Sequence, residues 1–253
     1  MPGQTLTESM TDSMNEALST VPAIQARGLT KLFGDYPALQ NVSFDVERGE
    51  FLALIGHNGA GKTTLLKLLA LLSRPSFGQL TIAGLDPADD PIALRHRIGL
   101  LGHNTFLYDE LTAEENLHFY GSLYGIHSLP QVCRDTLESV GLTPFAGELV
   151  RTFSRGMRQR LTIGRLFLHQ PELLLLDEPF SGLDERAVAL LESLLGQAHK
   201  NGTTIVLCTH QLDLALKHAK KLMILHRGKL AHLGAIEPAR QAETQELYRR
   251  FVG

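Results

Sequence analysis

The sequence predicts an α/β fold with a mostly parallel sheet, an N-terminal antiparallel β subdomain and an inserted helical subdomain. Apolar runs typical of buried strands recur along the chain, at Phe51 to Ile55, Leu173 to Leu176, Thr204 to Cys208 and Leu222 to Leu225. Helical segments such as Glu185 to His199 separate them, and this alternation favours parallel pairing. Residues 90 to 170 carry helical spacing without a clear strand signal, which predicts the helical subdomain over roughly 90–165.

Strands are expected from residue 24 onward. Val42, Phe44 and Val46 alternate with polar residues, which indicates a strand with one buried face. The remaining elements are expected, in chain order, as a turn at 48–50, a strand at Gln79 to Ile82, a hairpin turn at Arg227-Gly228 and a surface helix at 238–252.

Length and composition limit the class of protein. The 253 residues are 43% hydrophobic, enough for a full core, and the net charge of −3 gives no sign of a nucleic-acid partner. Cys133 and Cys208 lack metal or redox spacing, so we expect reduced core thiols. No apolar run approaches the roughly 18 residues of a membrane span. Residues 1–22 lack the features of a signal peptide and are expected to be a mobile tail before one domain at 23–253.

A glycine-rich loop follows the strand 51–55 and precedes an apolar helix. It reads G-x-x-x-x-G-K-[ST] and consists of Gly56, His57, Asn58, Gly59, Ala60, Gly61, Lys62, Thr63 and Thr64. Its backbone N–H groups can wrap phosphates, Lys62 can reach the β- and γ-phosphates, and the Thr63 hydroxyl can hold Mg²⁺. A plain glycine turn is the alternative. The strand–loop–helix context favours a P-loop NTPase core that binds ATP and Mg²⁺.

Two later strands end in residues that suit phosphate chemistry. Asp177 and Glu178 follow the apolar strand 173–176, where ligands of α/β sheets bind. Asp177 can hold Mg²⁺, and Glu178 can orient or deprotonate an attacking water. His210 follows the strand 204–208 and can donate to the γ-phosphate. The alternative for the two acids is that they cap a turn or the next helix.

A second candidate anion site lies at "FSRGMRQR", residues 153 to 160. Ser154 and Gly156 are typical of a capped helix start with exposed N–H groups, which favours an anion. The chain already has one complete phosphate loop, and the residues alone leave open what a second anion site would bind.

These motifs in this order resemble the ATP-binding cassette (ABC) family, over residues 24 to 236. The family signature has the form L-S-G-G-Q, and Phe153 to Met157 occupies its place, with Ser154 and Gly156 matching. The resemblance implies a head-to-tail dimer with a second copy or a homologous subunit. Each signature, here Ser154, Gly156 and Met157, would then close over the γ-phosphate held by the other chain.

Further site residues follow from the resemblance alone. Phe33 matches an aromatic that stacks on adenine, although it would also pass for a core residue. Asp184 matches the acid of a loop that crosses the dimer interface, although Ser181 to Asp184 also suits a helix cap. The family's usual Gln after the segment Ile98 to Leu101 is replaced here by His103 and Asn104, and either could coordinate Mg²⁺.

The resemblance also implies what the chain works with. "LTAEENLHFYGSLYGI" and "SRGMRQR" look similar to the ATP-binding subunit of the haem exporter of cytochrome c maturation. An ATPase subunit of a drug, lipid or polysaccharide exporter is the alternative, and a cassette ATPase acting on DNA or ribosomes is a third. The expected protein is a translocase ATPase on the cytoplasmic face of the cell membrane, docked to an integral membrane permease through residues 103–125.

Overall fold

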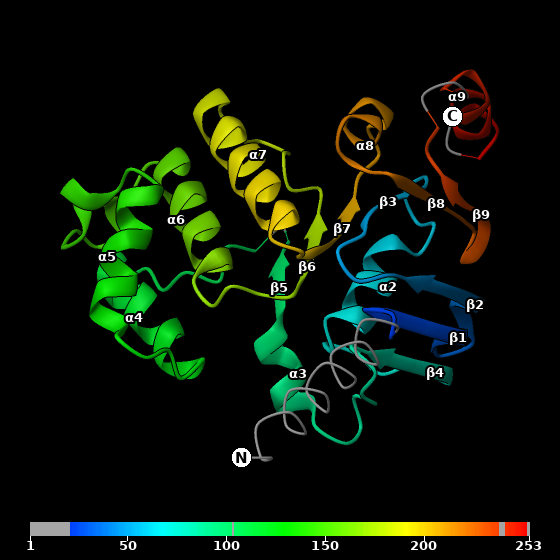
Figure 1. Ribbon diagram of the computed structural model, residues 1–253, viewed down its shortest axis with the longest axis horizontal. Helices are drawn as coiled ribbons and strands as arrows, with labels where there is room; N and C mark the ends of the chain where they lie inside the picture. The colour runs from blue at the N-terminus through cyan, green and yellow to red at the C-terminus, as the bar shows by residue number, and fades with distance from the viewer. Residues whose placement is uncertain (1–20, 103, 238–240, 252–253) are drawn as a thin grey trace, which may run out of the picture.

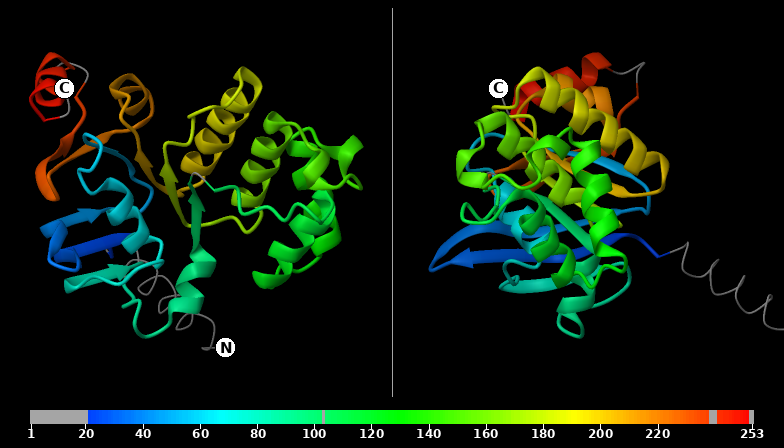
Figure 2. Two further views of the ribbon diagram at one scale, coloured as in Figure 1. Left: turned by 180° about the vertical axis from the view of Figure 1, so that it is seen from behind. Right: turned by 90° about the vertical axis from the view of Figure 1, so that its left-hand side faces the viewer.

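The computed structural model describes residues 21–102, 104–237 and 241–251 (Figure 1). Most of the expected tail at 1–22, and His103, lie outside these residues. The helical cluster occupies one end of the molecule and an antiparallel sheet the other, with the larger sheet between them (Figures 1 and 2).

The N-terminal β subdomain is a three-stranded antiparallel sheet. It consists of β1 (Ile24–Phe33), β2 (Tyr36–Val46) and β4 (Phe77–Ile82), in the order β2-β1-β4. The side chains of Val42, Phe44 and Val46 are buried, as their alternation with polar residues predicted. The expected antiparallel β subdomain is therefore confirmed.

The central sheet has six strands in the order β5-β6-β7-β3-β8-β9. Its strands are β3 (Phe51–Ile55), β5 (Ile98–Leu101), β6 (Leu173–Asp177), β7 (Thr204–Cys208), β8 (Lys221–His226) and β9 (Lys229–Ala235). All neighbours are parallel except β8 and β9. Arg227 and Gly228 both have positive φ in the β8–β9 turn, which suits a two-residue hairpin. The mostly parallel sheet is confirmed.

Strand β5 corrects the expectation that residues 90–170 hold no strand. Ile98 to Leu101 pairs in parallel with Leu173 to Leu176 at one edge of the central sheet. Four residues, one of them Gly99, are too few for a clear apolar run, so tertiary pairing decides the conformation. The preceding helix α3 (Pro91–Arg97) belongs with this strand, because its Leu94 is buried in the core between the two sheets.

Helices cover both faces of the central sheet. Helix α2 (Lys62–Leu69) packs in the core between the central sheet and the three-stranded sheet. Helices α7 (Glu185–Lys200) and α8 (Leu212–His218) pack on the opposite face, and α9 (Gln241–Phe251) lies beside them (Figure 1). In β3 the successive side chains alternate between these two cores, which explains its continuous apolar run.

The helical cluster has a core of its own. Its elements are α4 (Ala113–Leu123), α5 (Leu129–Ser139), the 3₁₀ turns η1 (Thr143–Phe145) and η2 (Val150–Thr152), and α6 (Arg155–Phe167). A capping box between Thr112 and Glu115 begins α4. Leu117, Cys133 and Leu161 are among its fully buried side chains. Cys133 and Cys208 are both free and buried, as expected of core thiols.

Candidate functional site

The glycine-rich loop is packed so closely that two glycines are required. A Cβ on Gly56 would lie 2.5 Å from the carbonyl oxygen of Leu225, and one on Gly61 would lie 2.7 Å from that of Ala38. Gly61 also has φ of 103°, a conformation that residues with a side chain rarely adopt. The loop therefore packs its glycines directly against β2 and β8.

The start of helix α2 fits a phosphate group. Gly61 is the N-cap residue, and no side chain caps this helix start. The first N–H groups of a helix have no intrahelical partner, so they can donate to an anion. Lys62 is 7% exposed, and its Nζ donates to the carbonyl oxygens of Gly56 at 2.6 Å and His57 at 3.2 Å. The Lys62 ammonium is thus held over the loop. Bound phosphates would replace those two carbonyls as its hydrogen-bond partners.

A hydroxyl and a carboxylate meet beside this loop. The Thr63 Oγ1 donates to Asp177 Oδ2 at 3.0 Å, although the two residues are 114 positions apart in sequence. Among the described residues no group of three His, Cys, Asp or Glu side chains could hold a metal. This donor set fits Mg²⁺, which takes one or two protein oxygens and completes its shell with water and substrate phosphates.

The residues after β6 and β7 form a hydrogen-bonded group. Glu178 has φ of 50°, an unusual conformation for a residue with a long side chain. Its carboxylate accepts from His210 Nδ1 at 2.8 Å and from Thr209 Oγ1 at 3.2 Å, and its N–H donates to the Cys208 carbonyl at 2.9 Å. The Tyr248 hydroxyl donates to the His210 carbonyl at 2.7 Å. These contacts hold the carboxylate in one orientation.

Helix α6 begins at the second candidate anion site. Ser154 is its N-cap residue, and its Oγ accepts from the Met157 N–H at 3.3 Å. A Cβ on Gly156 would lie 2.7 Å from Asp184 Oδ2, so the signature segment packs directly against the loop that contains Asp184. The Gln159 Nε2 also donates to the Gly182 carbonyl at 2.7 Å. Asp184 itself caps α7 by accepting from the Ala187 N–H.

The two candidate anion sites do not meet within one chain. Helices α2 and α6 lie on opposite sides of β6, seen both from the front and from behind (Figures 1 and 2). Lys62, Thr63, Asp177, Glu178 and His210 instead gather at the carboxyl ends of β3, β6 and β7, which are neighbours in the central sheet.

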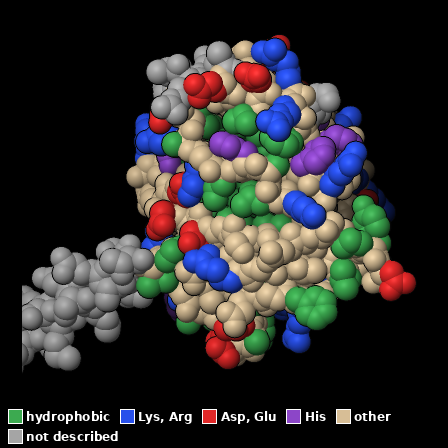
Figure 3. Space-filling view, turned by 90° about the vertical axis from the view of Figure 1, so that its right-hand side faces the viewer, with side chains coloured by type: hydrophobic (Ala, Val, Ile, Leu, Met, Phe, Trp, Pro, Cys, Tyr) green, Lys and Arg blue, Asp and Glu red, His purple; other side chains and the backbone are tan. Residues whose placement is uncertain are grey.

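The residues assigned by resemblance alone are less closely tied to this edge. Phe33 is 56% exposed at the tip of the β1–β2 hairpin, and Lys31 lies over its ring at 5.4 Å. This hairpin contacts the glycine-rich loop through Ala38. On the face of the molecule that carries the hairpin, apolar and basic side chains lie side by side (Figure 3). Asn104 is exposed after β5, without a hydrogen bond to Thr63 or Asp177 in the described part of the chain. His103 lies outside the described residues.

Sequence reasoning missed two residues that orient the site. Thr209 donates to Glu178 and also accepts from the Gln211 N–H, and Tyr248 reaches His210 from α9. The position of Thr209 beside His210 was a usable signal for it. Nothing local to Tyr248 indicated a contact with a residue 38 positions earlier.

Comparison with known proteins gives a consistent result. The family model for ABC transporters matches residues 39–181, which is more than half of the chain. The ABC transporter ATP-binding protein NatA of Bacillus subtilis is 35% identical over 212 residues, which cover 83% of this chain and 86% of NatA. The daunorubicin resistance ATP-binding protein DrrA3 of Streptomyces coeruleorubidus is 35% identical over 224 residues, 88% of this chain and 71% of DrrA3.

Solved structures match across most of the chain. The structure of an ATP-binding subunit of an ABC transporter superposes with a TM-score of 0.83 at 32% identity, covering 90% of this chain and 98% of that one. The dimeric ATP-binding cassette MJ0796, in a post-hydrolysis state bound to ADP and Pi, superposes with a TM-score of 0.75 at 26% identity, covering 85% and 99%.

Proposed function

The chain belongs to the ABC transporter family as an ATP-binding subunit with ATPase activity, and from this premise we propose that it powers export through a separate membrane subunit. One observation carries the assignment of its catalytic site. Lys62, Thr63, Asp177, Glu178 and His210 come from three separate strand ends and gather at one edge of the sheet. The polar groups that phosphoryl transfer needs are thereby brought together.

Each of these residues has a separate role in the proposed reaction. Lys62 and the N–H groups that begin α2 bind the β- and γ-phosphates, while Thr63 and Asp177 would hold Mg²⁺, which supplies positive charge against the phosphate oxygens. Glu178 orients the attacking water and accepts its proton. His210 Nδ1 contacts the Glu178 carboxylate in this structure, and we propose that His210 donates to the γ-phosphate when ATP is bound.

Replacing the proposed base tests this assignment. Glu178→Gln keeps the size of the side chain and can still accept one of the two hydrogen bonds, from Thr209 or from His210, but removes the base. We expect ATP binding to persist while turnover falls by about 10²-fold or more, as for other general bases. Equilibrium binding of ATP and steady-state release of phosphate measure the two effects. Turnover at the wild-type rate would exclude Glu178 as the base.

We infer that the site is completed by a second chain. Helix α6, which begins after Ser154, lies across β6 from the chain's own α2 (Figure 1), and the γ-phosphate needs donors on its open side. The dimer of MJ0796 supports pairing of two such domains. Ser154, Gly156 and Met157 would then bind the γ-phosphate held by Lys62 of the partner, with Asp184 beside the same interface.

The relatives bear on what is exported. DrrA3 is named for daunorubicin resistance, and this supports a drug or related exporter over the haem exporter suggested by the sequence. No helix among the described residues is long and apolar enough to cross a membrane. We propose, from the family to which the chain belongs, that the cargo pathway is in a separate permease, with this subunit docked on its cytoplasmic face.

The surface proposed for that docking is the aromatic part of the helical cluster. Phe106, Tyr108 and Phe119 are 50%, 47% and 38% exposed, and the rings of Tyr108 and Phe119 are 4.9 Å apart. The Tyr120 hydroxyl donates to the Phe106 carbonyl, which ties this surface to the loop that follows β5. Docking here would couple the permease to the loop that contains Asn104.

Cross-linking tests the docking surface. A photo-reactive amino acid at Tyr108, used in the cells that make this protein, should capture a protein that stays in the membrane after an alkaline wash. The matched control is Tyr36, which is also exposed but lies on the antiparallel sheet. Capture of the same membrane protein from both positions, or of none from Tyr108, would contradict the assignment.

A further inference from the structure

His210 lies in the short segment that joins β7 to α8, at the carboxyl edge of the central sheet. Its imidazole is 58% exposed, so solvent rather than packing surrounds much of it, and its position depends on the backbone that carries it. The preceding residue, Thr209, is held on two sides. Its N–H donates to the Leu54 carbonyl at 3.1 Å, and its Oγ1 accepts from the Gln211 N–H at 3.1 Å. The backbone of His210 itself is contacted from much further along the chain.

Helix α9 lies against this segment and is itself fixed to the central sheet. Its side chains Leu247, Tyr248 and Phe251 pack against the apolar core that α7 and α8 form on this face of the sheet. His226 ends β8, and its Nδ1 donates to the Phe251 carbonyl at 3.1 Å, while the centres of the two rings are 5.8 Å apart. The last turn of α9 therefore has a defined position relative to β8.

Tyr248 connects this helix to His210. It lies one turn before Phe251, and its hydroxyl donates to the His210 carbonyl at 2.7 Å. A tyrosine has only two side-chain torsions, so a hydroxyl on a ring that packs against the core is a stiff donor. The carbonyl of a residue proposed to act on the γ-phosphate is thus held by a side chain 38 positions later in the sequence.

We propose that Tyr248 is a positioning residue for ATP hydrolysis, which acts by fixing the backbone of His210. This inference rests on the proposed role of His210 at the γ-phosphate. The His210 Nδ1 contacts Glu178 in the structure, so the imidazole would turn toward the phosphate when ATP is bound. With the backbone held by Tyr248, that change needs only a rotation of the side chain. The donor is then already oriented when charge develops on the phosphate.

The proposed role predicts an effect on turnover rather than on ATP binding. The groups proposed to bind the phosphates, Lys62 and the N–H groups that begin α2, belong to a different element from the segment between β7 and α8. Releasing the His210 carbonyl would let that segment adopt arrangements in which the imidazole does not reach the phosphate. Such a change lowers kcat and leaves KM unchanged. Helix α9, expected only as a surface helix, would thus contribute to catalysis.

Tyr248→Phe tests the proposal because it removes the hydroxyl and keeps the ring. We expect kcat to fall about two- to tenfold, the effect of losing one hydrogen bond, while KM for ATP changes by less than about twofold. Steady-state release of phosphate measures both. If thermal unfolding shows that this variant is not folded at the assay temperature, Tyr248→Met, which also lacks the hydroxyl, takes its place.

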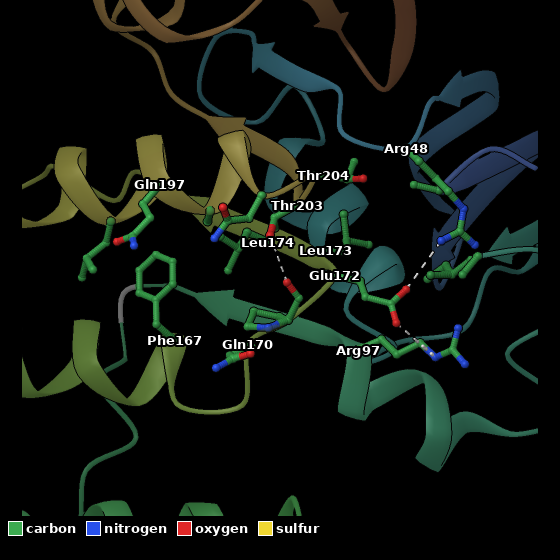
Figure 4. Close-up of a pocket in the computed structure, with 18 residues that line it drawn as sticks. Arg48, Arg97, Phe167, Gln170, Glu172, Leu173, Leu174, Gln197, Thr203 and Thr204 are labelled. Carbon is green, nitrogen blue, oxygen red and sulfur yellow. Dashed lines mark hydrogen bonds and ion pairs between the residues drawn. The ribbon is translucent and has the colours of Figure 1, made fainter. Parts of the chain in front are cut away.

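Thr203→Val is the matched control. The Thr203 hydroxyl also donates to a backbone carbonyl, that of Pro171 at 3.4 Å, but it lines a pocket at the amino ends of β6 and β7 (Figure 4). The same kind of hydrogen bond is therefore removed at the opposite edge of the sheet. This variant should keep the wild-type kcat, and a loss equal to that of Tyr248→Phe would overturn the proposal.

A double-mutant cycle separates this inference from the proposed role of His210. Single turnovers with the protein in excess over ATP keep slow rates measurable. We expect His210→Ala to slow hydrolysis by about 10²-fold or more. Adding Tyr248→Phe to that variant should slow it no further, because Tyr248 acts through the imidazole.

The other outcomes of the cycle show which assignment fails. Hydrolysis at the wild-type rate in His210→Ala would overturn the proposed role of His210 and with it this inference. If His210→Ala is slow but Tyr248→Phe hydrolyses ATP at the wild-type rate, the role of Tyr248 alone is overturned. An equal effect of Tyr248→Phe with and without the imidazole would also overturn it, because the tyrosine would then act by another route.

Discussion

Individual residues of the proposed ATP site are assigned from sequence because their chemistry is local. The glycines, Lys62 and Thr63 are read from one loop, and the close packing of Gly56 against Leu225 explains why no other residue fits there. The strained conformation of Glu178 and its contact with Thr209 depend on how β6 and β7 pair. No local sequence pattern indicates the pairing of β6 with β7. The sequence therefore predicts which residue is the proposed base, but not the contacts that orient it.

Among the residues proposed to bind ATP, Lys62 has the most distinct role. Lys62→Ala removes the mobile cation from the β- and γ-phosphates, and we expect ATPase activity to fall by about 10²-fold or more. Lys67→Ala, at an exposed position on the same helix, is the matched control and should leave activity near that of the wild type. Phosphate release at saturating ATP measures both. Similar activities in the two variants would remove Lys62 from the site.

At the scale of elements, apolar runs identified the strands that are covered on both faces and failed for the short edge strand β5. One contact at this strand has a measurable consequence. His169 follows α6, and its Nε2 lies 3.2 Å from the Ile98 carbonyl, while its ring stacks on Tyr124 at 3.8 Å. Its Nδ1 is buried without a hydrogen-bond partner among the described residues, and burial lowers the pKa of His169 to about 4. The helical cluster and β5 are thus joined through a neutral histidine.

This histidine should make stability depend on pH. Above about pH 6.5 it is neutral in both states and changes nothing. Between about pH 6.5 and the folded value of about 4, only the unfolded chain binds the proton, so its contribution to stability falls as the pH falls. His169→Gln keeps a donor for Ile98 but does not titrate. From pH 7 to 5 we expect it to lose about 1–2 kcal/mol less unfolding free energy than the wild type.

Urea unfolding at the two pH values measures this difference. His127→Gln, a change of the same type at an exposed position, is the control and should follow the wild type. An identical loss of unfolding free energy in His169→Gln and the wild type would show that His169 takes up its proton in the folded state as readily as in the unfolded one.

At the scale of the whole molecule, the order of the motifs is read from the sequence, and the structure shows that they lie apart in space. The loop that contains Lys62 and the helix that begins after Ser154 are on opposite sides of β6 (Figure 1). In the proposed arrangement a single chain carries two halves of a site, one on each side of β6 (Figure 1). A dimer with twofold symmetry would join each half to the complementary half of its partner, because such an interface repeats every contact twice.

Mixed dimers test this arrangement directly. With Lys62→Ala in one subunit and Ser154→Arg in the other, both changes fall at one composite site and leave the second intact. With both changes in one subunit and a wild-type partner, each site carries one change. In a Glu178→Gln background, where bound ATP is not turned over, we expect the first dimer to retain ATP through gel filtration at one site and the second to retain little. Because retention does not require turnover, coupling between the sites during hydrolysis cannot mask the difference. Equal retention by the two dimers would mean that Ser154 does not act on the ATP of its partner.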